Sequence, residues 1–377
     1  MPWYPSFYQL THDFSALPFH YEKLCQVVKI TPSLSGHHCR LKLTNRYGKQ
    51  DLVFDEIMIA DNPAFNDAQT ICYLHQRQII IPQGQVIKTD PVLLMTNSGQ
   101  PVYVRMVAKR SQEYADFAST YQSDLTNATI SRSLTMKPVF SNRWRARKGW
   151  FSLESLEIQT LRSPKYQIEI TGDSLVESGM VTAPLIQYFN QHYPDQFVWY
   201  QTGISGNQLL HDAPVEEPLY ETFGNSLLHR QRLNPISTQI TLAIIGTNDL
   251  LLPYYSHVIA DQNVTPRTLL QGFQQLQNQC ATRESRLLTT TIASLRLFDL
   301  PTLQPVEELI ELQRERINQL LVQQPGVIDG GQLLTNPRTG QLDDRYDFGD
   351  HIHWNPAGGQ KIAKAFSFLI QKTLALS

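Results

Sequence analysis

The sequence predicts an all-β N-terminal domain followed by an α/β domain built on a parallel, doubly wound sheet. Two observations predict this order: short runs of alternating polarity with frequent turns fill the N-terminal part, whereas strand-like and helix-like runs alternate after residue 165. The length of 377 residues also suggests two domains rather than one. We place the boundary so that the domains cover residues 1–160 and 161–377.

The N-terminal part has the period of β-strands. Residues 40–44 alternate between apolar and polar, and residues 102–108 do so with Val102, Val104, Met106 and Ala108 on one face. Residues 78–87 form two short runs that Pro-Gln-Gly interrupts. Turn signals recur at residues 33–36, 45–48 and 97–100. Short strands at such spacing predict a sandwich or a barrel.

The C-terminal part alternates between two kinds of run. Strand-like runs lie at residues 166–170, 197–201, 239–245, 286–293 and 326–330. Helix-like runs lie at residues 183–193, 217–232, 265–280, 305–324 and 356–376. Residues 239–245 are almost continuously apolar, as in a strand buried on both faces. Such alternation predicts a parallel sheet with flanking helices.

The composition is that of a globular protein. Hydrophobic residues make up 41% of the chain and charged residues 18%. The formal net charge of −2 provides no broad basic field for nucleic acid. No apolar stretch is as long as the about 18 residues that are needed to span a bilayer. The N-terminus lacks the basic and apolar segments of a secretory signal. We expect a cytoplasmic protein with no nucleic-acid or membrane partner.

The cysteines predict no special chemistry. No two of Cys25, Cys39, Cys72 and Cys280 form a Cys-x-x-Cys pair, which argues against a zinc ribbon or a dithiol redox motif. Free, mostly buried thiols are therefore expected. Phosphate-binding signatures are also missing, since there is neither a G-x-x-x-x-G-K-[ST] motif nor a G-x-G-x-x-G after a strand.

Four polar clusters fall at the predicted strand ends or before the last helix. They are Gly172-Asp173-Ser174, residues 203–207, residues 246–249 and residues 347–356. Ligands of open parallel sheets bind at the carboxyl ends of the strands, so we expect all four clusters on one rim of the sheet.

Together the clusters contain the groups that acyl transfer requires. Ser174 lies at a strand-to-helix turn, where a helix N-terminus favours an anion. A serine needs a base, which is usually a histidine oriented by a carboxylate, and Asp350 lies three residues before His353. Gly206 can offer a backbone N–H and Asn248 a side-chain amide to the developing negative charge.

These residues resemble the GDSL/SGNH hydrolase superfamily. Its ordered blocks occur here as "GDSL" at 172–175, "SGN" at 205–207, "GTND" at 246–249 and "DHIH" at 350–353. The resemblance covers residues 166–376 and implies a flavodoxin-like sheet. It also implies Ser174 as nucleophile, His353 as base and Asp350 as its partner. The oxyanion hole would consist of the Ser174 N–H, the Gly206 N–H and the Asn248 side chain.

The N-terminal part resembles the jelly-roll-like β-sandwich domain that precedes the catalytic domain in a subset of these hydrolases. Residues 34–60 and 120–129 carry this looser similarity. Several of those relatives resemble carbohydrate esterases. The chain departs from the family pattern at four positions near the expected pocket, which are Ser178, Gln208, His351 and Trp354.

Simpler interpretations exist for individual residues. Ser174 can cap a helix, and Asn248 can belong to a turn after a strand. We expect structural roles for Asp173 and Asp249, and Gly206 can serve backbone geometry alone. His351 is a rival to His353, and both can join Asp347 and Asp350 in a metal site. Trp354 fits packing or a wall of the acyl pocket, and Tyr254 and Tyr255 fit packing or a cleft lining. His211 and Asp212 fit the surface or the rim of the site.

The function expected from this set is that of a serine esterase. Its substrate would be a small acyl ester, in particular an O-acetyl group on a sugar, and no metal or organic cofactor is implied. Two alternatives stay open at this point. An acyltransferase would use the same site with an alcohol acceptor, and a non-catalytic protein would bind a glycan. The sequence does not reveal the acyl length, the alcohol, the oligomeric state or any contribution of the β domain to the site.

Overall fold

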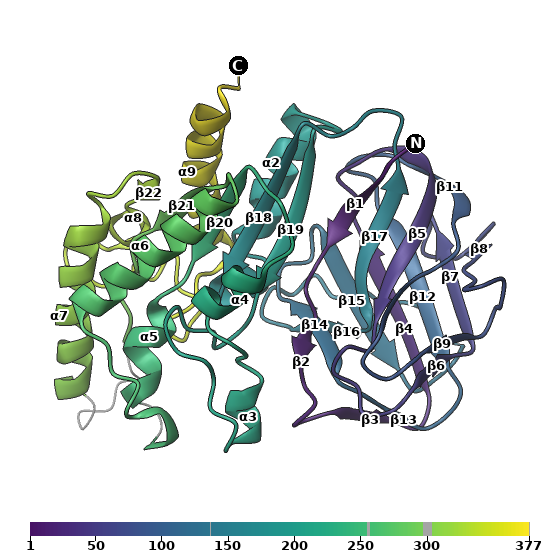
Figure 1. Ribbon diagram of the computed structural model, residues 1–377, viewed down its shortest axis with the longest axis horizontal. Coiled ribbons are helices and arrows are strands. Elements are labelled where there is room, and N and C mark those ends of the chain that lie inside the picture. Colours follow the sequence, from purple (N-terminus) through teal and green to yellow (C-terminus); the bar gives the residue numbers. More distant parts are fainter. Residues whose placement is uncertain (136, 255–256, 297–303, 377) are drawn as a thin grey trace. The chain divides into compact units, whose positions relative to one another are not determined.

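The computed structural model describes residues 1–135, 137–254, 257–296 and 304–376 (Figure 1). The chain divides into two compact units, Met1–Gln167 with Ile186–Gln201, and Ile168–Leu185 with Thr202–Ser377. The first unit therefore takes in residues beyond position 160, and the domain limits of 1–160 and 161–377 stay a prediction.

The first unit contains seventeen β-strands among its described residues up to position 159. They are β1 (Trp3–Tyr8), β2 (His12–Asp13), β3 (Phe19–Tyr21), β4 (Leu24–Ile30), β5 (Gly36–Thr44), β6 (Leu52–Phe54), β7 (Glu56–Ala60), β8 (Gln69–Thr70), β9 (Ile79–Ile81), β10 (Val86–Lys88), β11 (Val92–Thr96), β12 (Val102–Ala108), β13 (Gln112–Tyr114), β14 (Asp116–Thr120), β15 (Thr126–Ser131), β16 (Lys148–Phe151) and β17 (Leu153–Gln159).

Two five-stranded sheets dominate this unit. One has the order β1-β17-β5-β10 with β11 also paired to β5, and the other has the order β15-β4-β12-β7-β8. Neighbouring strands are antiparallel, as in β12 with β4 and β17 with β5. Val102, Val104, Met106 and Ala108 of β12 enter one buried core, as their alternation predicts. The jelly-roll-like arrangement stays a prediction.

The elements after position 165 alternate between strands and helices. They are β18 (Tyr166–Gly172), α1 (Ser174–Glu177), α2 (Thr182–His192), β19 (Phe197–Gly203), α3 (Pro218–Glu221), α4 (Leu227–Leu233), β20 (Ile240–Ile244), α5 (Thr247–Leu251), the 3₁₀ turns η1 (Leu252–Tyr254) and η2 (His257–Ile259), α6 (Pro266–Thr282), β21 (Arg286–Thr290), α7 (Gln304–Leu321), β22 (Val327–Ile328), α8 (Gly330–Leu334) and α9 (Pro356–Leu374).

A five-stranded sheet organises this part of the chain. Its order is β19-β18-β20-β21-β22, which is the order 2-1-3-4-5 of a doubly wound fold. β18 is parallel to β20, β20 to β21, and β21 to β22. The predicted α/β class is therefore confirmed. In such a sheet ligands bind where the strand order reverses, which here is the carboxyl end of β18 and β20.

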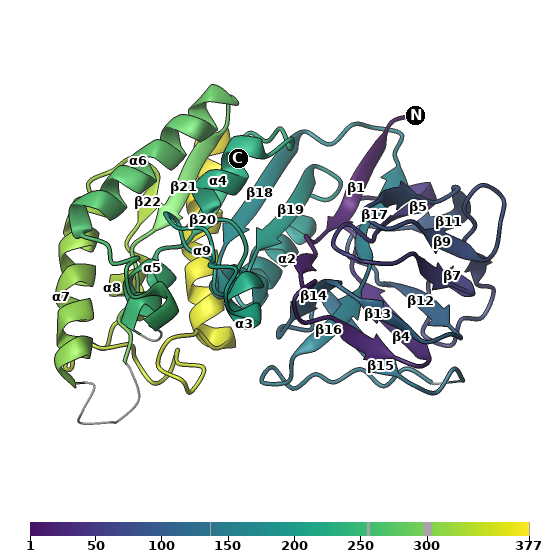
Figure 2. The ribbon, with the colours of Figure 1, turned by 60° about the horizontal axis from the view of Figure 1, so that its bottom comes forward.

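Helices lie on both faces of this sheet. Figures 1 and 2 show α4 and α6 on one face and α9 on the other. The helix α6 begins where the Thr-Pro signal predicts, because Thr265 forms a capping box with Thr268 and Pro266 occupies the first turn. Its apolar side, with Leu269, Phe273 and Leu276, packs with Ala243 and Ile245 in a buried core.

The prediction of one helix over residues 217–232 is wrong. Two short helices, α3 and α4, occupy this stretch. Gly224 has a φ of +69°, which ends helical geometry, and Ser226 then caps α4 by accepting from the His229 N–H. The strand predicted over 326–330 is also shorter, because Asp329 already caps α8.

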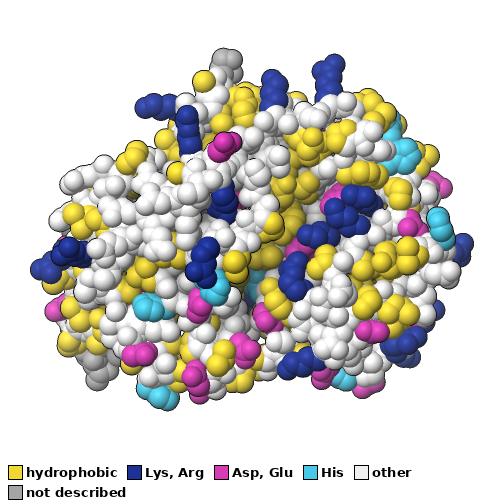
Figure 3. All heavy atoms as spheres, viewed as in Figure 1, with side chains coloured by type: hydrophobic (Ala, Val, Ile, Leu, Met, Phe, Trp, Pro, Cys, Tyr) yellow, Lys and Arg dark blue, Asp and Glu magenta, His cyan; other side chains and the backbone are white. Residues whose placement is uncertain are grey.

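Side chains of different kinds are mixed on the visible surface. Figure 3 shows acidic and basic side chains on the same face, with hydrophobic side chains between them. Among the described residues, no helix is both long enough and apolar enough to cross a membrane. The four cysteines are unpaired, and three of them are buried.

The close approach of β18 and β20 leads to a first prediction. Gly172 has a φ of +143°, and a Cβ at this position would run into the backbone oxygen of Ile244. Gly172→Ala should therefore lower the free energy of unfolding by at least about 3 kcal/mol, through strain and the clash together. Gly340→Ala is the matched control, because Gly340 also has a positive φ, +75°, but open space around it. It should cost only about 1–2 kcal/mol. Equal losses in urea unfolding of the two variants would contradict this account.

Candidate active site

The turn after β18 presents Ser174. The N-cap of α1 is Asp173, whose carboxylate accepts from the Leu175 N–H at 2.9 Å, so the capping role falls to Asp173 rather than to Ser174. Asp173 is buried, and its second oxygen has no hydrogen-bond partner among the described residues. Burial raises the pKa of Asp173 to about 7, although the Leu175 N–H and the charge of His353 oppose this shift. Asp173 shapes the turn and leaves the Ser174 hydroxyl available.

A chain of two hydrogen bonds joins Ser174 to the loop before α9. The Ser174 Oγ lies 2.8 Å from His353 Nε2, and His353 Nδ1 lies 2.7 Å from Asp350 Oδ2. The other Asp350 oxygen accepts from the backbone N–H groups of Ile352 and His353. With Nδ1–H donating to the carboxylate, Nε2 is left to accept the serine proton.

The charges around His353 suit a base. Burial lowers its pKa, but the hydrogen bond and the charge of Asp350 raise it, and the charges of Asp173 and Glu177 add to the rise, so that the pKa lies above the ordinary 6.5. For Asp350, burial raises the pKa, whereas the hydrogen bonds and charge of His353 lower it to about 2. Asp350 is thus ionised at neutral pH and can stabilise an imidazolium.

Two backbone N–H groups near this pair have no acceptor. Among the described residues, no hydrogen bond uses the N–H of Ser174 or that of Gly206. Gly206 has a φ of +79°, and the Phe223 ring occupies the space that a Cβ would need. Both facts require glycine at this position. The buried Asn248 donates one amide hydrogen to the Asn207 oxygen at 3.0 Å, which leaves its second hydrogen for another acceptor.

Two side chains that the sequence analysis did not single out hold residues 204–207, called the Gly206 loop below. Arg230 of α4 donates to the backbone oxygens of Thr202 and Gly172 and to Asn207 Oδ1. Glu177 of α1 accepts from the N–H and hydroxyl of Ser205. No spacing signal reveals either residue, because each acts across segments that are distant in sequence.

Asp249 has the structural role that was expected. Its two oxygens accept from the N–H groups of Leu209 and Leu210, at 2.8 and 3.0 Å. Burial raises its pKa to about 6, against the lowering effect of these bonds. Asp249, in residues 246–249, thereby holds the chain just after residues 205–207.

The rival histidine, His351, forms a pair of its own. His351 Nδ1 lies 2.6 Å from Asp347 Oδ2, and an Arg296 Nη2 lies 3.2 Å from the same ring nitrogen. His351 has a φ of +62°, and Asp347 also accepts from the Gly349 and His351 N–H groups. The structure brings His353, not His351, to Ser174. In the described part of the chain, no group of three or more His, Cys, Asp and Glu side chains is arranged for a metal ion.

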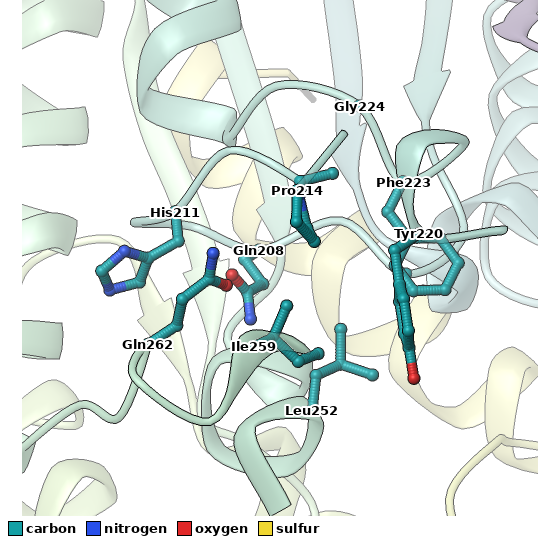
Figure 4. Close-up of a pocket in the computed structure, with 11 residues that line it drawn as sticks. Gln208, His211, Pro214, Tyr220, Phe223, Gly224, Leu252, Ile259 and Gln262 are labelled. Carbon is teal, nitrogen blue, oxygen red and sulfur yellow. The ribbon is translucent and has the colours of Figure 1, made fainter. Parts of the chain in front are cut away.

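A small cavity lies beside Gly206. Its lining includes Gln208, His211, Pro214, Tyr220, Phe223, Leu252, Ile259 and Gln262 (Figure 4). Its volume is about 10 Å³, which is room for about one water molecule. Figure 4 shows the Tyr220 and Phe223 rings next to each other on one side of it. His211 thus lines this cavity, whereas Asp212 bonds to His229.

The other candidate residues make structural contacts. Trp354 is buried and contacts the position of Gly358, as a packing residue does. The Ser178 hydroxyl donates to the Leu175 oxygen. Tyr254 packs at the edge of a buried cluster, and Tyr255 lies outside the described residues.

Comparisons with known proteins were made for the whole chain. Neither protein-family models nor curated proteins match it. Solved structures do: an alpha/beta hydrolase from the metagenome of Lake Arreo, Spain, is 16% identical with a TM-score of 0.42, covering 57% of this chain and 98% of that chain. A GDSL-like lipase from Bacteroides thetaiotaomicron is 15% identical with a TM-score of 0.40, over 56% and 92%. An acetylxylan esterase from Geobacillus stearothermophilus is 14% identical with a TM-score of 0.39, over 57% and 96%.

These descriptions name the same kind of protein as the resemblance found in the sequence. TM-scores below 0.5 do not by themselves establish a shared fold or activity. The function is therefore inferred from the geometry of Ser174, His353 and Asp350.

The Asp350–His353 pair makes a prediction that needs no substrate. Asp350→Asn removes the charge that raises the pKa of His353, so this histidine should lose its proton at lower pH than in the wild type. Nitrogen NMR of the imidazole ring during a pH titration measures this directly. Asp347→Asn is the control, because Asp347 pairs with His351, and it should leave the His353 titration where it was. A His353 titration that is identical in wild type and Asp350→Asn would contradict the assignment.

Proposed function

We propose that this protein is a serine carboxylic-ester hydrolase. One observation carries the proposal, namely the continuous hydrogen-bonded chain from Ser174 Oγ through His353 to the ionised Asp350. A hydroxyl bonded to a neutral imidazole nitrogen, with the opposite nitrogen bonded to a carboxylate, is the arrangement that activates serine for attack on a carbonyl carbon.

Acylation follows from this arrangement. Ser174 Oγ bonds to the ester carbonyl carbon while its proton passes to His353 Nε2, and Asp350 stabilises the resulting imidazolium. The negative charge moves to the carbonyl oxygen, where the Ser174 N–H, the Gly206 N–H and the second Asn248 amide hydrogen can receive it. Collapse breaks the bond to the alcohol oxygen, which takes the proton from Nε2 and leaves an acyl-serine.

Deacylation uses the same groups. A water molecule gives a proton to His353 Nε2 as its oxygen attacks the acyl carbon. The bond to Ser174 Oγ then breaks, the serine regains its proton from His353, and the carboxylic acid departs. No cofactor takes part in this sequence of steps.

We further propose that the acyl group is small, in particular acetyl, and that the alcohol is a sugar. Both points follow from the resemblance to carbohydrate esterases in the sequence. The small cavity beside Gly206 does not carry them, because neither Ser174 nor His353 lines it.

The finer fold assignments belong to the same proposal. They are a flavodoxin-like SGNH-hydrolase domain at residues 161–377 and a jelly-roll-like accessory domain at residues 1–160. Within the described residues, no feature specifically favours an acyltransferase or a non-catalytic glycan-binding protein over the hydrolase.

Replacement of the nucleophile tests the reaction. Ser174→Ala should lower kcat for an acetyl ester such as 4-nitrophenyl acetate by at least about 10⁴-fold, because the acyl-enzyme cannot form. It should also abolish covalent labelling by a fluorophosphonate. Ser178→Ala is the matched control, four residues along the chain, and should keep both properties. Wild-type turnover by Ser174→Ala, or an unlabelled wild-type protein, would refute the proposal.

A panel of acyl lengths tests the substrate class. The proposal of a small acyl group predicts that kcat/KM for acetyl esters exceeds that for octanoyl esters of the same alcohol by at least about tenfold. Equal or higher kcat/KM for octanoyl esters would remove the argument for a small acyl group while leaving the serine mechanism intact.

A further inference from the structure

The helix that carries Ser174 also carries a buried carboxylate. Helix α1 is one turn long, and Glu177 is its last residue, three positions after Ser174. Residues three apart on a helix lie on neighbouring parts of its surface. Glu177 is only 6% exposed. Burying a charge costs free energy unless the charge is hydrogen-bonded. Hydrogen bonds to the Glu177 carboxylate therefore offset the cost of burying it.

Those bonds reach the loop of the second block. Glu177 Oε2 accepts from the Ser205 N–H at 2.9 Å and from the Ser205 hydroxyl. Ser205 directly precedes Gly206, whose N–H is free of any acceptor in the described part of the chain. We propose that Glu177 is a positioning residue of the esterase site: its carboxylate fastens the Gly206 loop to the helix that presents Ser174. This inference rests on the proposed function and deepens it.

The other hydrogen bonds that hold this loop involve residues on either side of Ser205. Ile204 donates to the Gly172 oxygen, and Asn207 is held by Arg230 and Asn248. Asp249 holds Leu209 and Leu210 farther along. Glu177 is thus the attachment, among those described, that links the residue next to Gly206 with the nucleophile's own helix.

This link affects the rate more than the binding of substrate. An oxyanion donor stabilises the transition state only when it already points at the oxygen, and displacement by about 1 Å can cost about 10²-fold in rate. One short helix sets the positions of both Ser174 and, through Glu177, of the Gly206 N–H. Loss of the carboxylate should therefore lower kcat and leave KM nearly unchanged.

Glu177 also acts on the base through its charge. The groups that face His353 are Asp350, Asp173, Glu177, the Ser174 hydroxyl and the Phe348 ring. Burial lowers the pKa of His353, and the three carboxylates raise it. The esterase needs neutral His353, so its activity falls as the pH drops through this pKa. Removing the Glu177 charge lowers that pKa and should extend activity to lower pH.

Three variants separate position from charge. Glu177→Ala removes both and should lower kcat about 10²-fold, with the acidic limb of the kcat/KM profile moved to lower pH. Glu177→Gln keeps an oxygen that accepts from the Ser205 N–H, so it should regain much of kcat while the acidic limb stays displaced. Ser205→Ala keeps the charge and the N–H bond, and should lower kcat slightly without moving the limb.

Controls make the outcome decisive. Glu217→Gln changes an exposed glutamate that makes no capping bond, and it should behave as the wild type in both readouts. Melting temperatures show whether each variant is folded, and if Glu177→Ala is not, the kcat of Ser205→Ala decides, because this variant removes one of the two bonds to Glu177. Wild-type kcat in a folded Glu177→Ala, or in Ser205→Ala where Glu177→Ala does not fold, would overturn the positioning role. An unmoved acidic limb in Glu177→Gln would overturn the effect of the Glu177 charge on His353. If the wild type itself shows neither ester hydrolysis nor fluorophosphonate labelling, the proposed function fails instead.

Discussion

The parallel pairing of β18 with β20 is the constraint on which the candidate site depends. Parallel strands end on the same edge of a sheet, so the segments that follow β18 and β20 begin next to each other. Gly172 permits this, because its Cα faces the Ile244 oxygen without a side chain between them. Ser174 and Asn248 therefore meet on one rim although 74 positions separate them in the sequence.

Three buried carboxylates accept hydrogen bonds from the segments that follow β18 and β19. Asp173 caps the helix that carries Ser174, Glu177 binds Ser205 just before Gly206, and Asp249 binds Leu209 just after the Gly206 loop. Burial raises the pKa of Asp173 to about 7 and that of Asp249 to about 6. Each accepts backbone N–H groups, which is how a loop without regular structure acquires a defined shape. Side chains from neighbouring segments thus hold the loop that contains Gly206 in one shape.

The loop before α9 contains two Asp–His pairs with different partners. Asp350 and His353 face Ser174, whereas Asp347 and His351 face Arg296. His351, which lies between Asp350 and His353 in the sequence, has a φ of +62°, and an antiparallel bridge joins Asp347 to Trp354 across this loop. The additional bond of Phe348 N–H to the His353 oxygen closes the same turn. The second pair therefore braces the turn that presents the first.

Local chemistry allowed much of this protein to be predicted from its sequence. Apolar periodicity located the parallel strands and the long helices, and the spacing of Asp350 and His353 within one loop already allowed their hydrogen bond. The helix over 217–232 failed because a single backbone conformation at Gly224 outweighs the apolar pattern around it. The pairing of the strands in the N-terminal part could not be predicted from periodicity, which says which face of a strand is buried but not which strand lies beside it.

By itself, then, the sequence determined the α/β class and the residue types available for chemistry, because both depend on short-range patterns. Only the tertiary structure decided which histidine reaches Ser174, and that Asp173 rather than Ser174 caps the helix. It also revealed Glu177 and Arg230 behind the Gly206 loop. The contacts of His353, Glu177 and Arg230 join segments that lie 23 to 179 positions apart, and nothing in a linear pattern records a distance in space.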